Sequence, residues 1–237
     1  PYRSGTNDDP VLMQRNVDAM EDMALAVFRR GHLPVLGEWF ALPLMKHAGS
    51  TAIGDAVFDE IFHPVARELI QRSLRHARTV GGDLACGVGT DQLAAGPGVT
   101  LAEVEAAYRE QLGVVEAEGG RVILMASRAL ASCAKGPDDY LALYARLLKD
   151  VSRPVVLHWL GEMFDPALRG YWGSTELPRA LDTVARLIEE NRAKVEGIKV
   201  SLLETKWELD LRRRLPAGVK MYTGDDFNYA ELMAGDG

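Results

Sequence analysis

The chain has 237 residues, enough for one large domain or two small ones, and its 47% apolar and 26% charged residues are typical of a soluble globular protein. A formal net charge of −7 argues against nucleic acid as a partner, because phosphate binding favours a basic surface. The sequence contains no signal peptide, lipidation motif or membrane-spanning apolar run, and its two cysteines are too few for a disulfide scaffold. These features predict a cytoplasmic protein without a membrane partner.

The first part of the chain predicts two helices separated by an extended stretch. Apolar residues recur at helical spacing over residues 11–30, and a glycine follows them. Residues 32–44 are predicted to be extended, because two prolines and a glycine interrupt them. A second helix is predicted over residues 55–80, with a kink or a split at Pro64.

From residue 83 onward, strand and helix patterns alternate. Short apolar runs predict strands at residues 83–86, 121–125, 154–160, 197–202 and 219–222. Helical spacing predicts helices at residues 101–118, 137–151, 177–195 and 205–215, the first of them with a capping box at Thr100 and Glu103. Repeated βα units indicate an α/β fold, best matched by a (β/α) TIM-barrel-like architecture that is incomplete or irregular. A doubly wound open sheet is the alternative.

One predicted strand carries a lysine among branched aliphatic residues, in "GIKVS" at residues 197–201. Because side chains alternate along a strand, Lys199 and Ser201 share one face while Ile198 and Val200 share the other. If the aliphatic pair packs against helices, the lysine points into the barrel. Burial there would lower its pKa and make the amine a nucleophile.

Such an amine condenses with a ketone or an aldehyde to form an imine, which accepts electrons when a carbon–carbon bond breaks. This chemistry predicts a small carbonyl compound as the partner and requires no cofactor. A structural role is the alternative, with Lys199 paired to an acid such as Asp225 or Glu162 or extending to solvent at the strand end. The spacing of the residues alone does not decide between them.

Four motifs follow one another along the second part of the chain. They are "GVGT" at residues 87–90, "DYLALYARLLKDVSRPVVLHWLG" at 139–161, "GIKVS" at 197–201 and "GDDF" at 224–227. From about residue 69 to the end, this series resembles the dihydrodipicolinate synthase and N-acetylneuraminate lyase family, and more narrowly a bacterial dihydrodipicolinate synthase-like branch. The resemblance implies a Schiff-base lyase or aldolase for a 2-oxo acid or related carbonyl compound, with Lys199 as the imine-forming residue.

The sequence departs from that family at the position of its proton-shuttling tyrosine, where this chain has His158. Histidine can transfer protons near neutral pH, so His158 is expected to act as the general acid and base, although a core histidine is nearly as good an interpretation. The predicted substrate-binding residues are Thr90, Ser127, Ser201, Gly224 and Asp225. The threonine pair and the aromatic pair of the family have no secure counterpart here.

The beginning of the chain suggests a different relationship. "PYRSGTNDD" at residues 1–9 and "GHLPVLGEWFALPL" at 31–44 resemble the start of a flavodoxin-like family related to nucleoside 2-deoxyribosyltransferases. The resemblance implies that Tyr2, Arg3 and Ser4 face a nucleoside or nucleotide. Residues 1–68 would then be an N-terminal α/β segment and residues 69–237 a partial barrel, joined as a natural fusion or as a chimera.

Two further interpretations stay open. A chimera or fragment could be catalytically silent, and its unpaired strand edges would favour a homo-oligomer that closes the sheet. A divalent metal could lie among the acids near His158, which are Glu162, Asp165, Asp225 and Asp226. The H-x3-E-x2-D spacing is not diagnostic of ligands, so the sequence favours no metal site.

Overall fold

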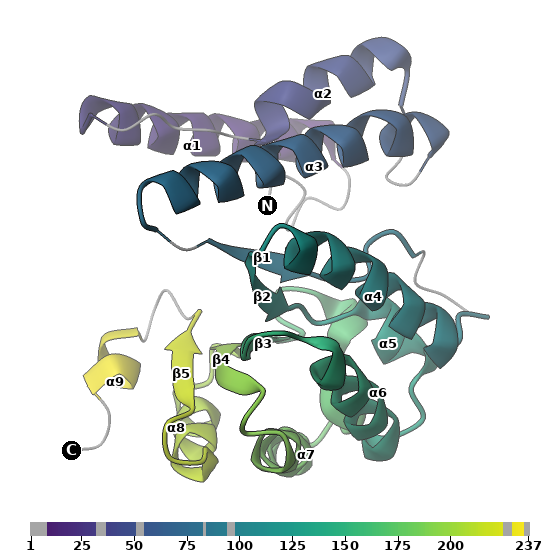
Figure 1. The fold of residues 1–237 in the computed structure, drawn as a ribbon, viewed down its shortest axis with the longest axis vertical. Helices are drawn as coiled ribbons and strands as arrows, with labels where there is room; N and C mark the ends of the chain where they lie inside the picture. Colours follow the sequence, from purple (N-terminus) through teal and green to yellow (C-terminus); the bar gives the residue numbers. More distant parts are fainter. Residues whose placement is uncertain are drawn as a thin grey trace. The chain divides into compact units, whose positions relative to one another are not determined.

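The structure is a computed structural model that describes residues 9–31, 37–50, 55–82, 84–93, 98–224 and 229–234 (Figure 1). Packing contacts divide the chain into two units, Pro1–Ser73 and Leu74–Gly237. The predicted boundary between residues 68 and 69 stays a prediction. In the described ranges, none of the helices combines the length and the apolar character needed to span a bilayer.

The described residues of the first unit form helices. These are α1 (Pro10–Arg29), α2 (Gly37–Ala48) and α3 (Ala56–Thr79), of which α3 continues into the second unit. The prediction of an extended stretch was wrong for residues 37–44, which belong to α2. Residues 32–36 lie outside the described residues. Ala41 and Met45 follow helical spacing and pack with Phe58 of α3, so burial of this face outweighs the helix-breaking tendency of a proline inside α2. α3 is not split at Pro64, which lies inside one continuous helix.

The second unit is built on a parallel sheet. Its strands are β1 (Ala85–Val88), β2 (Arg121–Leu124), β3 (Val155–Leu160), β4 (Val195–Ser201) and β5 (Lys220–Thr223). Its helices are α4 (Leu101–Ala117), α5 (Arg128–Cys133), α6 (Pro137–Asp150), α7 (Leu177–Glu190), α8 (Thr205–Arg214) and α9 (Tyr229–Ala234), with short 3-10 turns η1 (Pro166–Leu168) and η2 (Tyr171–Gly173). All the strands and long helices predicted after residue 83 are therefore present.

The order of the strands gives the second unit a (β/α) TIM-barrel-like architecture. Neighbouring strands follow chain order from β1 to β5, with a helix between consecutive strands, and α4, α6, α7 and α8 contact one another in that same order. A doubly wound sheet would instead reverse its strand order near the centre. Within the described residues, β1 and β5 each pair with one neighbour, so this barrel is incomplete. Closure of the sheet by a second copy stays a prediction.

The two sides of the sheet differ in burial. The side facing α4 to α8, here called the helix-facing side, carries aliphatic residues with no exposed surface: Val88, Leu124, Leu157, Ile198 and Val200. The opposite side is here called the open face and carries Arg121, Ile123, Val156, His158, Leu160, Lys199, Ser201, Lys220 and Tyr222. Several of these residues are partly or largely exposed. The alternation predicted for Lys199 and Ser201 against Ile198 and Val200 is confirmed.

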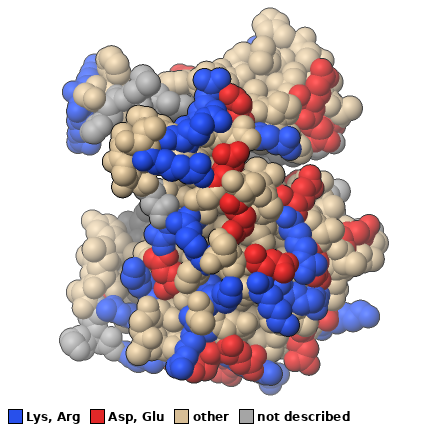
Figure 2. All heavy atoms as spheres, viewed as in Figure 1, with Lys and Arg blue, Asp and Glu red and all other residues tan. Residues whose placement is uncertain are grey.

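Charged side chains of both signs lie on the surface of the second unit. Figure 2 shows Lys and Arg interspersed with Asp and Glu on the visible face. One example is Arg109 of α4, which forms ion pairs with Glu105 of the same helix and with Asp150 of α6. The mixed charges on this face lie close enough to neutralise one another locally.

At the start of α4, Thr100 and Glu103 form the predicted capping box.

Candidate functional site

Lys199 lies between two side chains contributed by neighbouring strands. In the parallel register, Lys199 of β4 is paired with His158 of β3 and with Tyr222 of β5. Side chains paired in this way point to the same side of a sheet. The fold therefore brings His158, Lys199 and Tyr222 into one row across the open face.

The Lys199 side chain runs past Gly224, close to Ser201. A Cβ atom at position 224 would lie 2.9 Å from Cε of Lys199 and 2.1 Å from Oγ of Ser201. The backbone N–H of Gly224 donates to the carbonyl oxygen of Val200 at 2.7 Å, which fixes the glycine there. Gly224 thus provides the space through which the lysine chain passes.

Lys199 is partly exposed, and an enclosed position for its amine stays a prediction. Within the described part of the chain, no side chain forms an ion pair or a hydrogen bond with its ammonium group. Of the two acids considered as structural partners, Glu162 pairs with Arg169 at 3.7 Å, and Asp225 lies outside the described residues. The amine therefore remains accessible to a ligand on the open face.

His158 is buried, with 5% of its surface exposed. Its Nε2 lies 3.5 Å from Oγ of Ser201, and its Nδ1 has no hydrogen-bond partner among the described residues. Burial, followed by the positive charge of Lys199, lowers the pKa of His158 from 6.5 to about 4. The imidazole is therefore neutral at pH 7.

Thr90 and Ser127 lie in the loops after β1 and β2. Their buried hydroxyl oxygens are 2.5 Å apart, and Oγ of Ser127 also accepts a hydrogen bond from the N–H of Leu130 at 3.0 Å, which caps α5. The N–H of Ser127 donates to Oη of Tyr171 at 3.1 Å. These bonds give both residues a structural role, and none of the described contacts links them to Lys199. Their role in substrate binding stays a prediction.

Of the acids considered for a metal, Glu162 and Asp165 lie within the described residues. Asp165 forms an ion pair with Arg128 and accepts a hydrogen bond from the N–H of Ala167 at 3.0 Å, at the start of η1. Within the ranges that the structure describes, no three His, Cys, Asp or Glu side chains gather closely enough to hold a metal ion. Asp225 and Asp226 lie outside those ranges, as do Tyr2, Arg3 and Ser4 of the proposed nucleoside loop.

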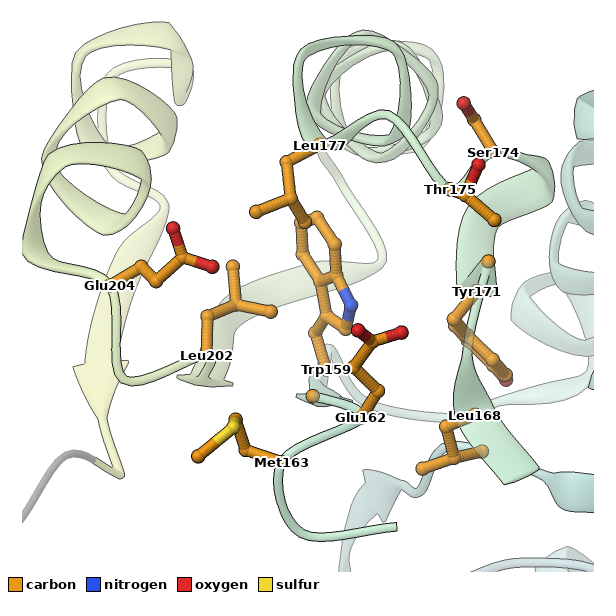
Figure 3. Close-up of a pocket in the computed structure, with 12 residues that line it drawn as sticks. Trp159, Glu162, Met163, Leu168, Tyr171, Ser174, Thr175, Leu177, Leu202 and Glu204 are labelled. Atoms are coloured by element: carbon orange, nitrogen blue, oxygen red, sulfur yellow. The ribbon is translucent and has the colours of Figure 1, made fainter. Parts of the chain in front are cut away.

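A cavity of about 250 Å³ lies beside the carboxyl ends of β3 and β4 (Figure 3). Trp159, Leu168 and Leu202 contribute apolar walls, and Glu162 and Glu204 contribute carboxylates. Trp159 belongs to the helix-facing side of the sheet, whereas Lys199 belongs to the open face. This cavity is therefore distinct from the row that contains Lys199.

Sequence reasoning missed two residues of the open face, Tyr222 and Glu196. Oη of Tyr222 donates a hydrogen bond to Oε1 of Glu196 at 3.0 Å. Strand alternation places Tyr222 on the same face as Gly224, which is the signal that could have identified it. No comparable signal exists for Glu196, because alternation alone assigns it to the side opposite Lys199.

Comparisons with known proteins find a family and several solved structures. A model of the family described as "Protein of unknown function (DUF993)" matches residues 60–237. Among solved structures, a 2-keto 3-deoxygluconate aldolase from Picrophilus torridus matches with 16% identity and a TM-score of 0.47, covering 70% of this chain and 52% of that chain. The chain thus spans about half the length of that aldolase. No curated protein matches, and these findings lend no support to a nucleoside 2-deoxyribosyltransferase part or to a chimera.

Proposed function

We propose that this chain, which belongs to the DUF993 family, is a Schiff-base lyase or aldolase that acts on a 2-oxo acid or related carbonyl compound through Lys199. One observation carries the proposal: Lys199 has no ion-pair partner among the described residues and is paired in register with a buried His158 whose Nδ1 is unsatisfied. Buried polar atoms without partners are uncommon in folded proteins and require an explanation, such as a bound ligand. The motif series around "GIKVS" supports the same assignment.

The chemistry begins with attack of the neutral Lys199 amine on the carbonyl carbon. The resulting carbinolamine loses one water molecule and becomes an imine. Once the imine is protonated, the hydroxyl on the far carbon of the scissile carbon–carbon bond loses its proton, that bond breaks, and its electron pair passes to the imine. The far fragment leaves as an aldehyde, and the enamine that remains takes up a proton on carbon. Addition of one water molecule releases the carbonyl product and restores the amine.

His158 supplies the proton transfers in this scheme. Its pKa is lowered to about 4, so the imidazole is neutral at pH 7 and acts as a relay that holds a proton only transiently. Ser201 lies within 3.5 Å of Nε2 and shares the open face with Lys199, so its hydroxyl is suited to hold the oxygen that leaves the carbinolamine.

Trapping with borohydride tests the proposal directly. The chain is incubated with pyruvate, other small 2-oxo acids and simple aldehydes, reduced, digested and mapped by mass spectrometry. We expect one dominant adduct, located on Lys199 and absent from Lys199→Met, whereas Lys149→Met on the exposed surface of α6 retains it. Absence of an adduct at Lys199 with every compound, or equal labelling of surface lysines, would falsify the assignment.

A further inference from the structure

The cavity beside the carboxyl ends of β3 and β4 has walls that the fold holds in place. Oη of Tyr171 pairs with Oη of Tyr144 at 2.8 Å and accepts the N–H of Ser127 at 3.1 Å, which fixes the ring that lines the cavity. On another wall, Oε1 of the buried Glu208 accepts a hydrogen bond from the N–H of Leu202 at 2.9 Å. A ligand that enters a cavity with fixed walls loses little free energy to reordering of the chain.

The side chain of Trp159 brings a hydrogen-bond donor into this cavity. Only 2% of the surface of Trp159 is exposed. Figure 3 shows its indole among the lining residues, with the ring nitrogen turned towards the side on which Tyr171 and Glu162 lie. No residue in the described ranges accepts a hydrogen bond from this nitrogen. Because an indole N–H is only a donor and usually has a partner when buried, a ligand here should offer an acceptor.

Two carboxylates line the same cavity. Figure 3 shows Glu162 and Glu204 on opposite sides of the Trp159 indole. Glu204 occupies the N-cap position of α8, but its side chain makes no capping hydrogen bond there. Glu162 forms an ion pair with Arg169 at 3.7 Å. Ionised carboxylates only accept hydrogen bonds, so a ligand should also offer donors, and their negative charge disfavours an anion.

We propose that this cavity binds a small neutral polyhydroxy compound, of the size of one sugar or sugar alcohol. A hydroxyl group both donates and accepts, so a polyol can satisfy the indole N–H and the two carboxylates together. A simple amine would leave the indole N–H without an acceptor, and a sugar acid would bring a third carboxylate beside two others. The volume of about 250 Å³ is below the roughly 300–1,000 Å³ of sites for drug-sized ligands, which suits a single sugar unit.

This inference does not depend on the proposed imine chemistry, because Trp159 and Lys199 belong to opposite sides of the sheet. The probes are methyl glycosides, sorbitol and xylitol, which have no carbonyl group and therefore form no imine with Lys199. Ligand-observed NMR titration measures their binding to the full chain. We expect saturable binding of at least one probe with a Kd on the order of 1 mM, as ligand efficiencies indicate for compounds of this size. Lys199→Met should bind that probe equally well.

Two substitutions in the cavity, each with a matched control, test the assigned contacts. Trp159→Phe keeps an aromatic ring but removes the N–H, and should weaken binding about five-fold. Trp207→Phe on α8, outside the cavity, should leave binding unchanged. Glu204→Gln removes one charge and should weaken binding of the neutral probe about five-fold while strengthening binding of gluconate, a sugar acid. Glu189→Gln, at an exposed position on α7, should change neither.

The outcomes decide the proposal even where one variant fails to fold. If circular dichroism shows that Trp159→Phe is unfolded, Glu204→Gln at its exposed position provides the readout. Loss of affinity in the cavity variants with unchanged controls supports the site. Absence of saturable binding for every neutral probe, or binding that neither cavity variant weakens, overturns it. Tighter binding of gluconate or of a diamine than of any neutral probe by the parent chain overturns the assigned ligand class.

Discussion

The two sides of the five-stranded sheet differ in the exposure and the charge of the side chains that they carry. On the helix-facing side, Val88, Leu157 and Ile198 have no exposed surface, as expected for residues that supply the hydrophobic core. On the open face, Lys199 and Tyr222 keep part of their surface in solvent, and charged residues form a network around Glu196. A step of one residue along β4 thus separates a buried aliphatic side chain from a partly exposed lysine.

This difference follows from what each side can stabilise. An ammonium group or a carboxylate buried under helices would lose its hydration and need a partner, whereas the open face lets such groups stay hydrated or pair across strands. His158 and Ser201 lie on the open face and are nevertheless buried. The neutral imidazole of His158 is the form that burial favours.

The largest effect is expected from truncating one leucine on each side of β3. Leu157→Ala removes a fully buried side chain and should lower the free energy of unfolding by about 3 kcal/mol, through lost burial and the cavity left behind. Leu160→Ala, on the partly exposed open face, should cost about 1 kcal/mol. Urea denaturation followed by circular dichroism measures both values. Equal losses would show that the open face is packed as tightly as the helix-facing side.

Two glycines of the open face should respond differently to an added methyl group. Gly197→Ala places Cβ 2.5 Å from the backbone oxygen of Lys220, so β5 must move, at a cost of about 2 kcal/mol. Gly224→Ala meets movable side-chain atoms of Ser201 and Lys199, so we expect a stability loss under about 1 kcal/mol but slower trapping at Lys199. Thermal unfolding measures the stability of the two variants, and borohydride trapping on the same samples measures the reactivity of Lys199 in each. A stable, fully reactive Gly224→Ala variant would contradict the close approach of the lysine.

The third effect concerns pH and appears only under acidic conditions. The pKa of His158 is about 4 in the folded chain and 6.5 when the imidazole is not buried, as in the unfolded chain. The unfolded chain therefore takes up the proton first as the pH falls. The associated stability is fully present above about pH 6.5 and is lost as the pH falls towards 4, amounting to about 2 kcal/mol between pH 7 and 4.5. His158→Gln should lack this component, whereas His63→Gln on the surface of α3 should keep it. Denaturation curves at both pH values test the difference, and parallel losses in the parent and His158→Gln would rule it out.

Much of the second unit could be predicted because its signals are local. The strands are short runs of apolar residues, the helices carry regular apolar spacing, and Thr100 with Glu103 forms a capping box within one turn. Alternation along β4 was sufficient to place Lys199 and Ser201 opposite the buried Ile198 and Val200. Each of these predictions depends on residues close together in the chain.

Other features could not be predicted from local signals. Residues 37–44 form part of α2 because Ala41 and Met45 pack against a distant helix, which outweighs the local proline. Glu162 and Asp165 resemble metal ligands in the sequence, yet each pairs with an arginine brought close by the fold. Such outcomes depend on which side chains are neighbours in space.

By itself, the sequence determined the alternation of strands and helices, the barrel-like strand order that this alternation favours, and the side of β4 on which Lys199 lies, because these follow from backbone periodicity and apolar burial. Only the tertiary structure decided that His158 and Tyr222 are the neighbours of Lys199, since strand register is set by packing between segments far apart in the chain. It also decided the direction of Glu196, because one extra residue in β4 reverses the side predicted by alternation.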